Sequence, residues 1–186
     1  MESSFEAAIE RGIRQTIVAV FLIGLDRRNP GAVVNSVVAF LGTYVPAVAE
    51  GEYGLEFRFW QRLYVGVAMV LHAVGMLGPY DNVRWWDHLT HTLSATIVGG
   101  AVFTAAKRRG HDPRPLTVGV VTITGLLWEL IEYLIHAIAN RLGLEPILVF
   151  YSRRDTVLDV VFNLLGAFVV VLVGERGLSN LVDDET

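Results

Sequence analysis

The sequence predicts an all-α, polytopic integral membrane protein, a bundle of about six transmembrane helices in one domain that covers residues 1–186. Composition is the first reason: 53% of the residues are hydrophobic, 18% are charged and the mean hydropathy is +0.47, too apolar for an ordinary soluble domain. The second reason is that the apolar residues fall into segments of roughly 20 residues, the length that crosses a bilayer. Short loops between these segments favour antiparallel packing.

Three of the candidate helices lie in the first half of the chain. The first, 13–25, is amphipathic at its start, so a helix that lies in the membrane interface is the alternative to a span. The second, 31–49, contains Pro46, which should kink or end it because proline has no amide hydrogen. The third, 57–77, stops at the Gly78–Pro79 pair.

The other three candidates are 86–106, 115–140 and 155–173. The fifth begins at a proline, which is a favourable first residue of a helix. In the fourth, Ala95 and Gly99 are four residues apart. Small residues at this spacing let helix backbones approach closely in a membrane.

Polar motifs interrupt the last three apolar segments. An ionisable side chain at the centre of a spanning helix costs about 2.5–3.5 kcal/mol on insertion scales, so such groups usually have a function. Because consecutive spans alternate in direction, the start of the fourth, the end of the fifth and the start of the sixth should lie on one side of the membrane. The motifs are Asp87-His88-Leu-Thr-His91, Glu129-Leu-Ile-Glu132-Tyr133-Leu-Ile-His136 and Asp155-Thr-Val-Leu-Asp159-Val-Val-Phe-Asn163.

Helical periodicity puts the polar residues of each motif on one face. Carboxylates and imidazoles that project from facing helices form the metal sites of helix bundles, and ligands without sulfur suit zinc, iron or manganese without choosing among them. We therefore predict a divalent metal, zinc or iron, bound by His88, His91, Glu132, His136 and Asp159. The predicted catalytic groups are Glu129, Glu132 and Asp155. The arginines predicted to bind an anionic part of the substrate are Arg84, Arg153 and Arg154.

Structural roles are open for the same side chains. Asp87 and Asp155 could cap helix N-termini. The other carboxylates could pair with the three arginines, which could also be ordinary flanking charges of the loops. Buried histidines are often only hydrogen-bonded. The convergence of three motifs on one side favours a functional polar centre over these separate roles.

The motifs also carry a resemblance to a known family. Residues 57–175, about two-thirds of the chain, are similar to the polytopic inner-membrane family typified by the bacterial protein YjdF. The resemblance implies a polytopic membrane fold and functional importance for the motifs, but no particular reaction. The family pattern has tyrosine before and tryptophan after the Glu-Leu-Ile-Glu core, whereas this chain has Trp128 before it and Tyr133 after it. His88 and His136 stand outside the pattern. The residues that carry the resemblance are Asp87-His88-x-x-His91, Trp128-Glu129-Leu-Ile-Glu132-Tyr133 and Asp155-x-x-x-Asp159-x-x-x-Asn163-x-x-Gly166-Ala167.

Three functions are compatible with such a centre. The one we favour is a membrane-embedded metal-dependent enzyme, a hydrolase or oxidase that acts on a lipid or a lipid-linked substrate. The alternative is a transporter coupled to protons or cations, in which the intramembrane acids bind the ion. A haem protein with His72, His91 or His136 as an axial ligand is the third, although neighbouring acids disfavour it.

Charge and composition bound the partners and the location. The net charge of −4 and the absence of a basic tract argue against nucleic acid, and the absence of cysteine excludes thiolate chemistry. Lysine and arginine are more numerous in the inner segments when the N-terminus is placed inside, so we expect a multi-pass protein of the cell membrane with a cytoplasmic N-terminus. The bilayer and a lipid substrate are the expected partners. The sequence leaves the oligomeric state open.

Overall fold

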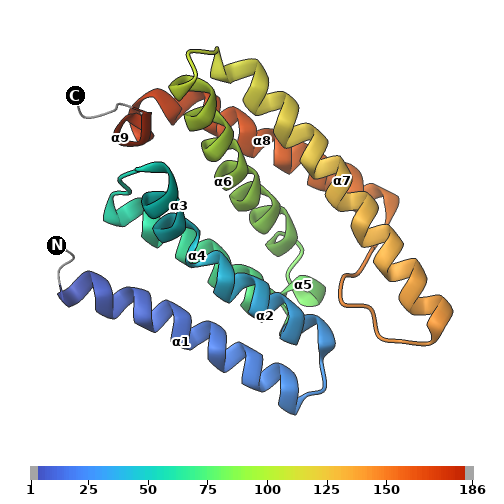
Figure 1. The fold of residues 1–186 in the computed structure, drawn as a ribbon. Coiled ribbons are helices and arrows are strands. Elements are labelled where there is room, and N and C mark those ends of the chain that lie inside the picture. The colour runs from blue at the N-terminus through green and yellow to red at the C-terminus, as the bar shows by residue number, and fades with distance from the viewer. Residues whose placement is uncertain (1–3, 183–186) are drawn as a thin grey trace. The chain divides into compact units, whose positions relative to one another are not determined.

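The computed structural model describes residues 4–182, and every regular element in this range is a helix (Figure 1). The chain divides into two compact units. One comprises the chain up to Trp86 together with Gly143–Ile147, and the other comprises Asp87–Leu142 with the chain from Leu148 onward. The all-helical class is thus confirmed, while a single domain over residues 1–186 stays a prediction.

The first unit is built on three helices that pack against one another, with two short helices beside them. Its core contains Ile17, Val20, Ala39 and Ala73, each less than 5% exposed. The small side chains of Ala39 and Ala73 leave room for the two helices that carry them to approach each other closely. The helices are α1 (Ser4–Asp26), α2 (Pro30–Gly42), α3 (Val45–Tyr53), α4 (Phe59–Gly75) and α5 (Pro79–Asn82).

The second predicted helix is broken into α2 and α3. The break lies at Thr43 and Tyr44, and Pro46 is the second residue of α3. Proline is tolerated there because the first amides of a helix have no partner within it. The predicted interruption is therefore present, with the proline just after it.

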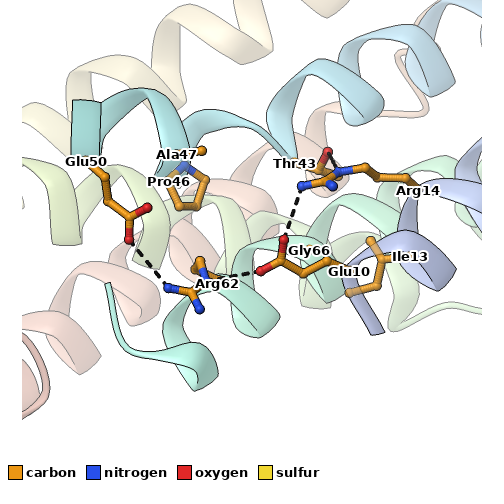
Figure 2. Close-up of a pocket in the computed structure, with 9 residues that line it drawn as sticks. All are labelled: Glu10, Ile13, Arg14, Thr43, Pro46, Ala47, Glu50, Arg62 and Gly66. Carbon is orange, nitrogen blue, oxygen red and sulfur yellow. Dashed lines mark hydrogen bonds and ion pairs between the residues drawn. The ribbon is translucent and has the colours of Figure 1, made fainter. Parts of the chain in front are cut away.

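Charged side chains join three segments of the first unit around a small cavity (Figure 2). The guanidinium of Arg62 lies 3.1 Å from Glu10 and 3.5 Å from Glu50. The guanidinium of Arg14 lies 3.2 Å from Glu10 and 3.4 Å from the hydroxyl of Thr43, and it also covers the ring of Tyr44. These pairs explain why α1 begins at Ser4, well before the predicted residue 13: its charged first half has partners on α3 and α4.

The second unit packs α6, α7 and α8 around Ala95, Val121 and Ala167. A Cβ added to Gly166 would lie 2.7 Å from the Cβ of Ala95, and one added to Gly99 would lie 3.3 Å from side chains of both other helices. The close approach expected from small residues in the fourth segment is therefore present. The helices are α6 (Trp86–Arg108), α7 (Pro113–Leu142), α8 (Arg153–Gly177) and α9 (Ser179–Val182).

Four segments of the described residues are long and apolar enough to cross a membrane. One is Pro30–Tyr53, which consists of α2 and α3 taken together. The others are the three long helices of the second unit. Of the remaining long helices, α4 has 17 residues and α1 carries charges through its first half. Several transmembrane helices are thus supported, and the count of about six stays a prediction.

Candidate metal centre

The first two groups of the centre come from one face of α6. Asp87 is the second residue of the helix, and His91 follows one turn later, where positions four apart are neighbours. The Nε2 atom of His91 lies 3.5 Å from Oδ1 of Asp87. Asp87 therefore faces the imidazole from inside the first turn of α6.

Asp159 reaches the same imidazole from α8. Its Oδ1 atom lies 3.9 Å from Nε2 of His91 and 3.2 Å from Nδ1 of His88, and the residue is 2% exposed. Asp159 thus pairs with two histidines. The N-terminus of α8 is capped by Ser152, whose hydroxyl accepts a hydrogen bond from the backbone N–H of Asp155. The cap is therefore Ser152, and Asp155 lies inside the helix.

Glu129 enters from the third helix, α7. Its Oε1 atom lies 4.0 Å from Nε2 of His91, is buried and has no hydrogen-bond partner among the described residues. Burial of an unpaired polar atom is costly, so such an atom usually marks a place where water or an ion binds. Three helices thus direct carboxylates at the same imidazole nitrogen.

Asp87, His91 and Asp159 each offer a ligand atom within 4.8 Å of the other two. Ligands at about 2.0–2.2 Å from a zinc ion lie about 3.3–3.6 Å apart in a tetrahedral shell. The 3.5 Å between Asp87 and His91 already fits, whereas the 3.9 Å between His91 and Asp159 and the separations of up to 4.8 Å within the group would have to shorten around an ion. The three side chains can therefore hold a divalent cation, with Glu129 next to it.

Two other acids surround these groups. Asp155 lies one turn before Asp159 on α8, and Glu132 lies three residues after Glu129 on α7. Both interact electrostatically with Asp87 and with Glu129. Five carboxyl groups thus lie close enough to interact, and a cation bound among them would stabilise their ionised forms.

Glu132 and His136, which the sequence places among the ligands, have other partners. Oε1 of Glu132 accepts a hydrogen bond of 2.9 Å from the indole of Trp128. Nδ1 of His136 accepts one of 3.3 Å from the backbone N–H of Phe150, in the segment before α8. Their roles as ligands stay a prediction, and neither belongs to the group of three.

The remaining polar residues singled out in the sequence lie partly in the second unit and partly in the first. Asn163 is buried one turn beyond Asp159, and its amide fills the space at Gly125 of α7, where an added Cβ would lie 2.7 Å from Nδ2. Arg153 and Arg154 are exposed at the start of α8. Arg84 and His72 belong to the first unit; Arg84 is exposed, and Nδ1 of His72 lies 3.1 Å from the hydroxyl of Tyr80.

Sequence reasoning missed two participants. The sequence places Asp87 on the polar face, and the spacing Asp87-x-x-x-His91 is a sufficient signal for a shared face, but Asp87 is not among the predicted ligands. Phe162 was not singled out at all. Its ring stacks on His88 with the centroids 4.5 Å apart and 3° between the planes. A single apolar residue in an apolar segment gives no signal of such a contact.

The comparisons with known proteins extend over most of the chain. The model of a family described as "Predicted membrane protein (DUF2238)" matches residues 9–180. A protein of Thermotoga maritima, described as an "Uncharacterized protein", is 23% identical over 181 residues, which cover 90% of this chain and 92% of that protein. No solved structure matches the chain. The likeness to the family typified by YjdF stays a prediction.

Proposed function

This chain belongs to the DUF2238 family of predicted membrane proteins, and from that premise we propose that it is a membrane-embedded, metal-dependent enzyme. The observation that carries the proposal is the group Asp87, His91 and Asp159, whose ligand atoms lie within 4.8 Å of one another on two apolar helices. A site of three ligands leaves a coordination position open for water or substrate, as in catalytic metal sites.

The chemistry that fits this arrangement is hydrolysis. A divalent metal held by these residues would lower the pKa of a water molecule bound to it. Glu129 lies beside the three ligands with an oxygen that has no hydrogen-bond partner, so it can accept the proton of that water. Asp155 and Glu132 are the further acids of the same region. Zinc suits hydrolysis, and iron remains the alternative because the ligand set admits both.

The alternative function is a carrier coupled to protons or cations. Transport sites of this kind often lie at helices that are interrupted inside the membrane. Here α6, α7 and α8 are continuous, and α7, which is 30 residues long, carries Glu129 without interruption. Continuous helices hold ligands in fixed positions, which favours the enzyme over the carrier.

Topology and substrate complete the proposal. The chain spans the cell membrane about six times, with a cytoplasmic N-terminus. The substrate is a lipid or a lipid-linked ester, amide or phosphoester. Arg153 and Arg154 are exposed at the first turn of α8, six and five residues before Asp159, and can bind an anionic headgroup there. Arg84 belongs to the first unit, and its role in binding the substrate stays a prediction.

Elemental analysis of the purified full chain tests the proposal. We expect one zinc or iron ion per chain, lost in Asp87→Asn, His91→Ala and Asp159→Asn. Glu175→Gln is the matched control, because Glu175 lies at the other end of α8 and pairs with Lys107. Wild-type protein that binds neither zinc nor iron would rule out the metal centre. Metal that accumulates inside proteoliposomes would favour the carrier.

A further inference from the structure

We propose that His88 is a positioning residue that orients Asp159 toward the metal and does not itself bind the ion. This inference deepens the proposed function and rests on it. It assigns a new role to the pair of His88 and Phe162, whose rings stack between α6 and α8.

The contact between His88 and Asp159 fixes both groups. Nδ1 of His88 lies 3.2 Å from Oδ1 of Asp159, and the two side chains are 17% and 3% exposed. As a metal ligand Asp159 would be ionised, and an ionised carboxylate only accepts hydrogen bonds, so Nδ1 of the imidazole is then the donor. The other ring nitrogen, Nε2, points to the opposite side of the ring. It cannot reach an ion held by Asp159 and His91 while this hydrogen bond is kept.

Phe162 fixes the plane of the imidazole. It follows Asp159 by three residues on α8, and its ring is nearly parallel to that of His88, at 3° and a centroid distance of 4.5 Å. Aromatic pairs contribute about 0.5–1.5 kcal/mol beyond the area that they bury. The same helix therefore supplies the carboxylate and the surface that holds its hydrogen-bond partner.

The consequence for Asp159 is a fixed orientation. With one oxygen held by His88, the carboxylate stays near the distance of 3.9 Å that separates it from Nε2 of His91. Residues that hold a metal ligand by a hydrogen bond commonly change metal affinity about 10–100-fold when they are replaced. Histidine at position 88 therefore increases affinity through Asp159.

Two replacements of His88 separate the hydrogen bond from the stacking. His88→Phe keeps a ring that can stack on Phe162 and removes the donor. His88→Asn removes the ring and keeps a donor, because the amide nitrogen occupies nearly the position of Nδ1. Phe162→Leu removes the stacking alone. The control is Phe168→Leu, since Phe168 lies on the same helix with 52% of its surface exposed.

The measurement is titration of each purified full-length variant with Co²⁺, followed by calorimetry and by the visible absorption of the bound ion. We expect His88→Phe to weaken binding about 10–100-fold and His88→Asn to recover most of that loss. Phe162→Leu should weaken binding less than His88→Phe, and Phe168→Leu should leave it unchanged. The absorption spectrum should keep its shape in every variant, because the ligands are the same.

A second comparison tests whether His88 acts through Asp159. The effects of His88→Phe and of Asp159→Glu, which moves the carboxylate but keeps it, should be far from additive, because both disturb the same oriented carboxylate. Unchanged affinity in His88→Phe, or a changed spectrum in His88→Asn, would overturn the positioning role while the metal centre stands. Failure of the wild type to bind Co²⁺, zinc or iron would overturn both this inference and the proposed function.

Discussion

Nε2 of His91 lies 4.0 Å from Oε1 of Glu129, and that oxygen is buried without a hydrogen-bond partner among the described residues. Because Glu129 stands beside the group of three and outside it, we expect it to act on bound water as a base. Glu129→Gln should keep the metal and lower hydrolysis about 10²–10⁴-fold. Metal content and turnover of chromogenic esters and phosphoesters check this. Loss of the ion in this variant would make Glu129 a ligand.

Gly166 should be needed for both the fold and the site. An added Cβ would lie 2.7 Å from the backbone oxygen of Thr92 and from Ala95, so Gly166→Ala must push α8 away from α6. Overpacking of this kind costs about 1–3 kcal/mol. We expect a lower unfolding temperature and weaker metal binding, measured in detergent by fluorescence and calorimetry.

The control for this substitution is Gly119→Ala on α7, where an added Cβ meets nothing within 4 Å. That variant should match the wild type in stability and in metal affinity. Equal stability of the two alanine variants would mean that α6 and α8 are not held at the close approach seen at Gly166.

The sequence correctly predicted part of the convergence of the polar motifs. The helical period determines which residues share a face of a helix, and the antiparallel order of neighbouring helices determines which helix ends lie together. Asp87, His91, Glu129 and Asp159 meet for this reason. His136 shows the limit. Its partner is a backbone N–H of the segment before α8, and the path of an irregular segment has no periodic signal.

The same contrast holds for the fold. The apolar segments predicted most helices to within a few residues. The early start of α1 was missed because Glu10 is partnered by Arg62, 52 residues later in the chain. Such long-range pairs do not appear in a local pattern. The stacking of His88 on Phe162 is likewise a consequence of how α6 and α8 pack.

Arg62 should stabilise the first unit without affecting the metal. Its guanidinium joins Glu10 of α1 to Glu50 of α3, and the side chain is 15% exposed. Removal of the guanidinium leaves the partly buried carboxylates of Glu10 and Glu50 without this partner. We expect this to lower the free energy of unfolding by about 1–3 kcal/mol, a value between those of exposed and buried ion pairs. Arg62→Ala should therefore lower the unfolding temperature. Metal content should stay at the wild-type level, because the ligands lie in the second unit. Loss of the ion together with stability would show that the two units depend on each other.

Impermeant thiol labelling should place the two ends of the second unit on opposite sides of the membrane. The start of α6 and the start of α8 both contribute to the centre, so Arg84→Cys and Ser152→Cys should react from one side. Lys107→Cys, at the far end of α6, should react from the other side. The wild type has no cysteine and is a clean background. In right-side-out vesicles, the expected cytoplasmic N-terminus puts positions 84 and 152 outside and 107 inside. Reaction of 84 and 107 from the same side would exclude α6 as a transmembrane helix and with it the six-span topology.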